Sequence, residues 1–276
     1  MNTILVPIDF SETSDNALNY AVGLANYLSA KIILLHVDSI PLINNEFQDL
    51  SFIISQSREE NIIMLKDKAE LIKKDDFLIG EVDYFAESGE LKSQINNYIT
   101  EKNIDFVVMG VSGHNTVIGK VILGSNAVSV SQESNVPVFI VPNNCKFKEI
   151  TNIAYASEYD TNVVEHNGLI QMKYINALFG SMLYVLHIIP DNHLINEQES
   201  QIDNFVEQKL NHTNHRTFII TDNDVSVAIL DFIAAHNIDL VVLEQKEYPF
   251  LYKLFHTSAT KDIAFNSPIP ILSIHN

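Results

Sequence analysis

Four of the nine glycines of the chain lie within fifteen residues, and the last of them precedes a serine. They are Gly110, Gly113, Gly119 and Gly124, followed by Ser125. Glycine adopts positive φ angles readily and lets the backbone approach a ligand closely. Because an apolar stretch precedes these residues and a helical pattern follows them, their amides could hold a phosphate at a helix N-terminus. The spacing therefore predicts a phosphate-binding loop in the first half of the chain.

Short apolar runs alternate with helical patterns, and they predict the elements that position this loop. In the first half, strands are expected at 2–8, 31–37, 81–86, 105–109 and 137–141, with helices between them. Four of these runs recur in order in the second half, at 150–156, 183–187, 239–243 and 270–274. Continuous apolar strands separated by helices are typical of a parallel sheet covered on both faces. We therefore predict an α/β fold with two doubly wound, Rossmann-like parallel-sheet domains in tandem, over 1–144 and 145–276.

The ends of the predicted strands indicate where a ligand would bind. In an open parallel sheet, ligands bind outside the carboxyl ends of the strands, where the sequence places Asp9, Val37 and Gly110. A helix that begins at residues 125–126 offers unpaired amides and the positive end of its dipole to an anion. We expect Lys120 to supply the positive charge of the loop to a triphosphate, with Mg²⁺ from solution.

Each of these residues also has a structural interpretation. Asp9 could cap the helix that follows it. Gly110 and Gly113 could serve a tight turn that holds no ligand. Lys120 could simply be solvated. The sequence leaves both interpretations open.

Charge argues against two classes of partner. Thirty-five acidic and seventeen basic residues give a net charge of −18, which repels nucleic acid and anionic membranes at long range. The sequence has no run of eighteen apolar residues and no basic segment before an apolar stretch at its start. We therefore predict a soluble, cytoplasmic protein that binds neither nucleic acid nor membrane.

Catalytic and metal-binding motifs are missing from the sequence. It has no Gly-x-x-x-x-Gly-Lys-[Ser/Thr] loop, no Gly-x-Ser-x-Gly elbow and no His-Glu-x-x-His. His36 and His187 occupy matched strand ends, but neither has a second ligand at usable spacing, so we expect buried, hydrogen-bonded histidines and no metal site. The sequence identifies no catalytic residue.

The motifs of the first half resemble those of a universal stress protein domain. They are Ile-Leu-Val-Pro-Ile-Asp-Phe-Ser at 4–11, Ile-Ile-Leu-Leu-His-Val-Asp at 32–38, Val-Val-Met-Gly-x-x-Gly at 107–113, and Gly-Ser at 124–125. The whole chain resembles a tandem, two-domain member of this family. The resemblance implies a fold of the adenine nucleotide alpha hydrolase type, intrachain pairing of the domains, and a homodimer formed through the final strands, 138–141 and 271–274.

The resemblance also implies roles for individual residues. In ATP-binding relatives, the residue matching Asp9 and the main chain of the residue matching Val37 contact the adenine. Residues matching Pro7 and Met109 help to form the pocket. Ribose and phosphates are held by the residues matching Gly110, Gly113, Gly124, Ser125 and Asn126. The implied ligand is ATP or AMP, and the implied chemistry is at most weak ATP hydrolysis.

Two departures from the family's pattern bear on this expectation. Ten residues separate Gly113 from Gly124, where the pattern has nine. In the second half, the glycine positions hold Glu244 and Glu247, the Gly-Ser pair is replaced by residues 256–257, and Glu158 takes the place of Asp9. Carboxylates at these positions would repel phosphate, so we predict that the second domain binds no nucleotide and is structural.

Three functions follow from these patterns. The first is a stress-response regulatory protein that binds an adenine nucleotide in its first domain. The second is an interaction or dimerisation module of the same fold that binds no nucleotide. The third, an adenylate-forming or electron-transfer enzyme on a related fold, lacks the signature loops such an enzyme would need.

Overall fold

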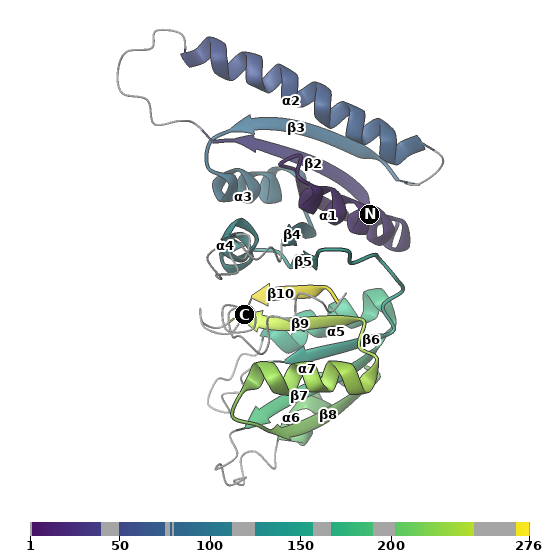
Figure 1. Cartoon of the computed structure of the whole chain (residues 1–276). Helices are drawn as coiled ribbons and strands as arrows, with labels where there is room; N and C mark the ends of the chain where they lie inside the picture. Colours follow the sequence, from purple (N-terminus) through teal and green to yellow (C-terminus); the bar gives the residue numbers. More distant parts are fainter. Residues whose placement is uncertain are drawn as a thin grey trace. The chain divides into compact units, whose positions relative to one another are not determined.

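The computed structural model describes residues 2–39, 50–74, 78, 80–111, 125–156, 167–189, 202–245 and 269–275. The described residues up to Phe147 belong to one compact unit, and those from Lys148 onward belong to a second. Strands and helices alternate in both units, and the strands within each unit pair in parallel (Figure 1). The predicted α/β fold with two doubly wound parallel sheets is confirmed.

The first unit has the strand order β3-β2-β1-β4-β5. Apolar, β-branched runs form the strands, and these runs are buried almost throughout. Figure 1 shows α2 lying along β3, and α3 next to α4. Its elements are β1 (Thr3–Pro7), α1 (Glu12–Leu28), β2 (Lys31–Asp38), α2 (Leu50–Lys73), β3 (Val82–Ser88), α3 (Leu91–Lys102), β4 (Phe106–Val111), α4 (Ser125–Glu133) and β5 (Val138–Pro142).

The second unit has the strand order β10-β9-β6-β7-β8. Its core is also apolar, with Tyr155 fully buried at its centre. Its elements are β6 (Asn152–Ala156), α5 (Asn167–Phe179), β7 (Met182–Ile189), α6 (Ile202–Lys209), β8 (His215–Thr221), α7 (Val225–His236), β9 (Leu240–Gln245) and β10 (Ile271–His275).

The strand registers show that the two units repeat one plan. In the first unit Ile4 lies opposite Phe106, and in the second Ile153 lies opposite Leu240. An aspartate beside each of these strand pairs accepts a hydrogen bond from the amide at the start of the first strand. The distances are 2.8 Å from Thr3 N to Asp105 Oδ2 and 3.0 Å from Asn152 N to Asp239 Oδ2. The internal duplication predicted from the apolar runs therefore extends to individual hydrogen bonds.

Asp239 forms hydrogen bonds and an ion pair with the residues just before β6. Its Oδ2 accepts from Thr151 N at 3.0 Å and Thr151 Oγ1 at 2.8 Å, and its Oδ1 lies 2.7 Å from Lys148 Nζ. Burial raises the pKa of Asp239, but the hydrogen bonds from Lys148, Thr151 and Asn152 outweigh burial and hold the pKa below its ordinary value of 3.8. The carboxylate therefore stabilises the fold in its ionised form.

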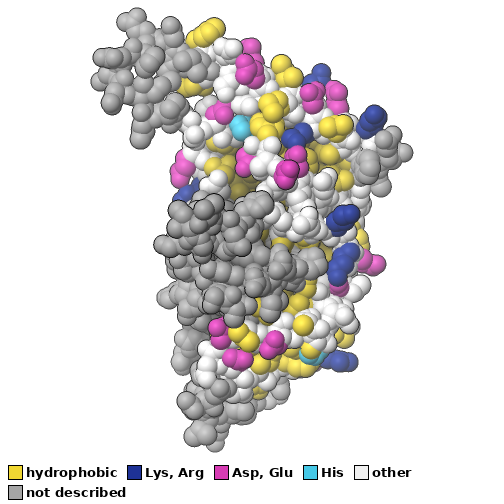
Figure 2. Space-filling model, viewed as in Figure 1, with side chains coloured by type: hydrophobic (Ala, Val, Ile, Leu, Met, Phe, Trp, Pro, Cys, Tyr) yellow, Lys and Arg dark blue, Asp and Glu magenta, His cyan; other side chains and the backbone are white. Residues whose placement is uncertain are grey.

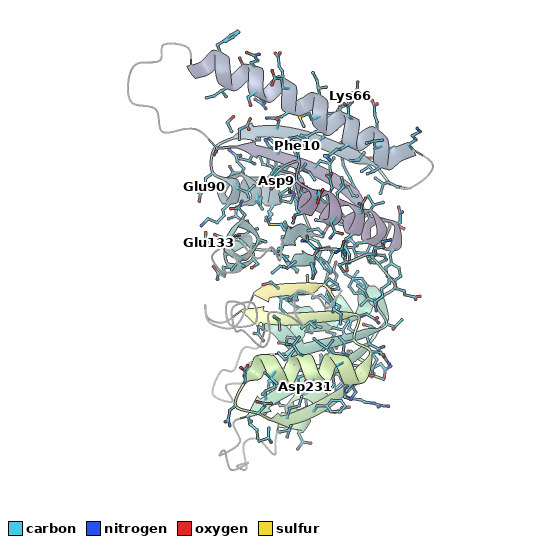
Figure 3. The ribbon with its side chains drawn as sticks, viewed as in Figure 1. Asp9, Phe10, Lys66, Glu90, Glu133 and Asp231 are labelled. Atoms are coloured by element: carbon cyan, nitrogen blue, oxygen red, sulfur yellow. The ribbon has the colours of Figure 1, made fainter. Side chains whose placement is uncertain are left out.

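We expect Asp239→Asn to lower the free energy of unfolding of the second unit by about 2 kcal/mol at pH 7, because an amide loses charge-assisted hydrogen bonds. Since the folded pKa is depressed, this contribution is complete above the ordinary pKa of 3.8 and is lost as the pH falls through the lower folded value. Urea unfolding at pH 7 and near pH 2.5 checks this, because the gap between variant and wild type should shrink in acid. Asp231→Asn, at an exposed position on α7 (Figure 3), is the matched control and should change little at either pH.

Candidate functional site at the sheet edge

The strand order reverses between β1 and β4 in the first unit. The chain moves outward from β1 through β2 to β3, and then crosses back to β4 and β5. The carboxyl ends of β1 and β4 are therefore the topological switch point, where doubly wound sheets form a crevice for ligands. Pro7 ends β1, Met109 and Gly110 lie near the end of β4, and Val37 lies near the end of the adjacent β2. The structure thus brings these four predicted residues to one sheet edge.

Asp9 organises the turn from β1 into α1. One carboxylate oxygen of Asp9 accepts hydrogen bonds from Ser11 N at 3.1 Å and Ser11 Oγ at 2.5 Å. Ser11 is the N-cap of α1, since its Oγ accepts from Ser14 N at 3.2 Å. The idea that Asp9 itself caps the helix is therefore wrong, because Asp9 holds the capping residue instead.

The carboxylate of Asp9 remains exposed and charged. Burial raises its pKa, but the hydrogen bonds from Ser11 and Ser14 lower it more, so the pKa of Asp9 lies below its ordinary value of 3.8. The hydrogen bonds from Ser11 occupy one oxygen, Oδ1. An ionised carboxylate can accept several hydrogen bonds, so Asp9 can serve Ser11 and also accept from an amino group of a ligand at this edge.

Phe10 has a backbone conformation that aromatic residues rarely adopt. Its φ angle is 61°, in the left-handed region that favours glycine. Its ring centroid lies 4.8 Å from that of His36 (Figure 3 labels Phe10 and Asp9). Such outliers persist where the surroundings fix them, and they cluster at functional sites. This conformation cannot be predicted from the sequence, because phenylalanine normally adopts a negative φ.

Gly110 lies inside β4, so the interpretation of this glycine as part of a tight turn is wrong. A Cβ atom at Gly110 would meet the carbonyl oxygen of Thr13 in α1, and it would lie 2.7 Å from Thr13 Cγ2. The first turns of α1 therefore approach β4 so closely that only glycine fits. A glycine is therefore needed here because the backbone of α1 packs against it. This packing also keeps the turn at Asp9 next to β4.

The predicted phosphate-binding residues are only partly described. α4 begins at Ser125, as expected, and Asn126 in its first turn is exposed. Gly113, Lys120 and Gly124 lie outside the described residues. The end of α4 is tied to α3, because Lys92 Nζ lies 2.8 Å from Glu133 Oε1 and 3.8 Å from Glu90 Oε1. Figure 3 labels both carboxylates, one at each helix.

At the corresponding strand position of the second unit, a glutamate side chain stands in place of the glycine. Glu244 occupies the strand position that corresponds to Gly110, and it is buried. Its Oε2 accepts a 2.5 Å hydrogen bond from the hydroxyl of Tyr155. On the facing helix α5, a Cβ at Gly168 would lie 2.5 Å from Glu244 Cδ and 2.6 Å from the Tyr155 hydroxyl. In the first unit the glycine that permits close packing lies on the strand, and in the second unit it lies on the helix.

The described part of the chain has neither a large basic patch on the face shown in Figure 2 nor a cluster of metal ligands. On the face shown in Figure 2, basic side chains lie singly or in small groups among acidic ones, and they form no large patch. No group of three or more His, Cys, Asp and Glu residues among the described positions could hold a metal ion. None of the described helices is long and apolar enough to cross a membrane.

The two units thus define a doubly wound α/β protein with a switch point at the carboxyl edge of each sheet. The family model of the universal stress protein family matches residues 1–142. Universal stress protein C of Salmonella typhimurium is 29% identical over 144 residues, which are 50% of this chain and 94% of that protein. Universal stress protein MJ0577 of Methanocaldococcus jannaschii is 28% identical over 154 residues, 50% of this chain and 93% of that protein.

Similarity to a solved structure extends over nearly the whole chain. The crystal structure of a universal stress protein from Archaeoglobus fulgidus covers 98% of this chain and aligns over 95% of its own, with a TM-score of 0.67 and 19% identity. At this identity the likeness shows the fold. The chain belongs to the universal stress protein family, in a tandem form.

Proposed function

We propose that this universal stress protein binds an adenine nucleotide, ATP or AMP, through its first domain (1–144), and that its second domain (145–276) is structural. The convergence of Asp9, Val37, Met109 and Gly110 at the switch point of the first sheet carries this proposal. The charged, exposed carboxylate of Asp9 suits an acceptor for the adenine amino group. The amides at the start of α4 suit the phosphates.

The contrast between the two units supports confining the ligand to the first. In the second unit, the side chains of Glu244 and Tyr155 fill the space beneath the start of α5. A carboxylate there would also repel phosphate. A protein of this family that binds no nucleotide and acts as an interaction module is the second candidate, favoured by the ten residues between Gly113 and Gly124.

Native mass spectrometry of freshly purified protein separates these candidates, followed by calorimetric titration with ATP and AMP, with and without Mg²⁺. cAMP, the ligand in the solved structure of one universal stress protein, is titrated beside them. One bound adenine nucleotide per chain is the expected result. If no nucleotide is carried through purification and none binds at millimolar concentration, the interaction module is the better description. Sedimentation of the same sample tests the predicted homodimer.

We expect Asn126→Asp to weaken nucleotide binding about tenfold, because it places a carboxylate beside the phosphates in the first turn of α4. The same change should leave the stability unaltered or raise it by a few tenths of a kcal/mol, since a negative charge favours a helix N-terminus. Calorimetry and urea unfolding measure the two effects separately.

Asn97→Asp is the matched control, because Asn97 is exposed on α3 and receives the same added charge. Its affinity for nucleotide should equal that of the wild type. Equal affinity of Asn126→Asp and Asn97→Asp would place the phosphates away from α4.

A further inference from the structure

β8 is the edge strand of the second sheet. It stands last in the strand order β10-β9-β6-β7-β8, and Figure 1 shows it beside β7, at the far side of the sheet from β10. Among the strands that the structure describes, β7 is its neighbour, and the two pair in parallel. An edge strand presents one row of main-chain N–H and C=O groups that the sheet does not pair. β8 is therefore open to hydrogen bonding along one side.

The hydrogen bonds at the two ends of β8 show which of its main-chain groups point outward. Leu183 N of β7 donates to Asn214 O at 2.9 Å, and Asp222 N donates to Ile189 O of β7 at 2.9 Å. Main-chain groups alternate in direction along a strand, so the even-numbered residues of β8 bond to β7. The N–H and C=O groups of the odd-numbered residues in 215–221 point away from the sheet. In the described part of the chain, no main-chain hydrogen bond occupies them.

The side chains of β8 do not protect this edge. The strand reads His-Arg-Thr-Phe-Ile-Ile-Thr and contains no lysine, acidic residue or proline, with which edge strands are commonly blocked. Ile219 is 40% exposed, and Thr221 is exposed as well. Phe218 faces the other side of the sheet, where its ring centroid lies 5.0 Å from that of Phe232 in α7. The strand therefore combines an open backbone with exposed β-branched side chains.

The edge strand of the first unit differs in this respect. β3 is last in the order of its own sheet and carries two carboxylates, Asp83 and Glu87. If two copies of β3 paired antiparallel about the central residue, Asp83 of one copy would lie opposite Glu87 of the other. Like charges directly opposite each other destabilise a strand pair. The edge at β3 is thus protected against pairing with itself, whereas the edge at β8 is not.

Two copies of β8 fit each other in an antiparallel register centred on Phe218. Thr217 of one copy then lies opposite Ile219 of the other, and His215 lies opposite Thr221. All four are odd-numbered residues with outward main-chain groups, so each opposed pair can exchange hydrogen bonds. Thr217 and Ile219 are both β-branched, and such side chains stabilise a pair across two strands. The strand is therefore complementary to a second copy of itself.

Charged side chains fit the same register. Arg216 of one copy lies diagonally across from Asp222 of the other, on the same face of the paired strands, at a spacing that long side chains can bridge. Arg216 is exposed. Asp222 Oδ1 accepts from Asp224 N at 2.8 Å, and an ionised carboxylate can accept a guanidinium as well. The two-fold symmetry of the pairing gives this ion pair twice.

We propose that β8 is a self-association surface, on which β8 of a second copy of this chain pairs antiparallel and extends the second sheet. The inference is independent of nucleotide binding, and its surface differs from the final strands through which the homodimer is predicted. Each copy carries a net charge of −18, but salt at 0.15 M screens charges beyond about 8 Å. The short-range contacts of the paired strands therefore decide the association.

Hydrogen exchange of the full chain in 0.15 M salt tests this proposal, read out by mass spectrometry of peptides at low and at high micromolar concentration. Peptides that cover β8 should exchange more slowly at the higher concentration, because the outward amides become bonded to the second copy. Peptides that cover β3 should exchange equally at both. Sedimentation alone does not assign the surface, since association through the final strands also raises the mass, and the exchange of β8 does.

Thr217→Pro removes one outward N–H and leaves the hydrogen bonds between β7 and β8 in place. Each pair of copies loses two hydrogen bonds, so the concentration needed to protect β8 should rise about tenfold or more. Ile219→Lys, which keeps every main-chain donor and adds a charge at the edge, should raise it as well. Ile170→Lys is the matched control, because Ile170 is 62% exposed on α5 of the same unit and receives the same change. It should behave as the wild type.

Two results would overturn the proposal. The first is exchange of β8 that does not depend on protein concentration, which would mean that no second copy occupies the edge. The second is concentration-dependent protection of β8 that persists in both Thr217→Pro and Ile219→Lys, which would place the contact elsewhere. Urea unfolding of the variants shows that they are folded, and Ile219→Lys serves the test if the proline lowers the stability of the second unit.

Discussion

Replacing Gly110 by alanine is expected to destabilise the first unit by about 3 kcal/mol, although the change adds one methyl group. The new Cβ would meet the carbonyl oxygen of Thr13, and it would lie 3.0 Å from the Thr13 carbonyl carbon. Both atoms belong to the backbone of α1, so no side chain can rotate to make room. Moving a helix against a packed sheet costs about 1–3 kcal/mol or more, because cores are packed at the density of crystals.

Urea unfolding measures this loss of stability. Hydrogen exchange, read out by mass spectrometry of peptides, assigns the loss to the unit that opens. Gly180→Ala is the control. Gly180 has a φ of 62° but nothing within 4 Å of the site of a Cβ, so its cost of about 1 kcal/mol is conformational and falls in the second unit. Gly110→Ala with wild-type stability would mean that α1 does not approach β4 as the structure has it.

The strands could be predicted because burial imposes a simple pattern on them. β1, β4 and β5 are buried on both faces, so their sequences are continuous apolar runs that stand out from the helices. β8 is not among the predicted strands, because it lacks such a run. Its residues, His215–Thr221, alternate between partly buried and exposed positions at a sheet edge, and such a strand needs no apolar run.

The site could be predicted in part. Its position follows from topology, since the ends of β1, β2 and β4 must meet at the switch point. The contacts that shape it could not be predicted, because they join residues remote in sequence. Gly110 suggested a ligand or a turn, yet its space is taken by Thr13 in α1. The contact between His36 Nδ1 and the carbonyl oxygen of Ile8 also joins residues that are far apart in the sequence, so spacing does not reveal it.

In the second unit, Gly168→Ala is expected to lower the free energy of unfolding by about 2 kcal/mol. Alanine normally stabilises a helix relative to glycine by up to about 1 kcal/mol, so the expected effect has the opposite sign. The reason is that the new Cβ would lie 2.5 Å from Glu244 Cδ and Oε2 and 2.6 Å from the Tyr155 hydroxyl. These groups form one buried hydrogen bond, so room can be made only by breaking it.

Glu244→Ala is expected to remove this conflict. In that background Gly168→Ala should cost less than about 0.5 kcal/mol, since the carboxylate no longer fills the space and no longer holds the tyrosine. A double-mutant cycle in urea therefore gives a coupling energy of about 1.5 kcal/mol or more. Additive effects of the two changes would contradict the contact. Strong coupling would show that Gly168 of α5 and Glu244 of β9 depend on each other through this contact.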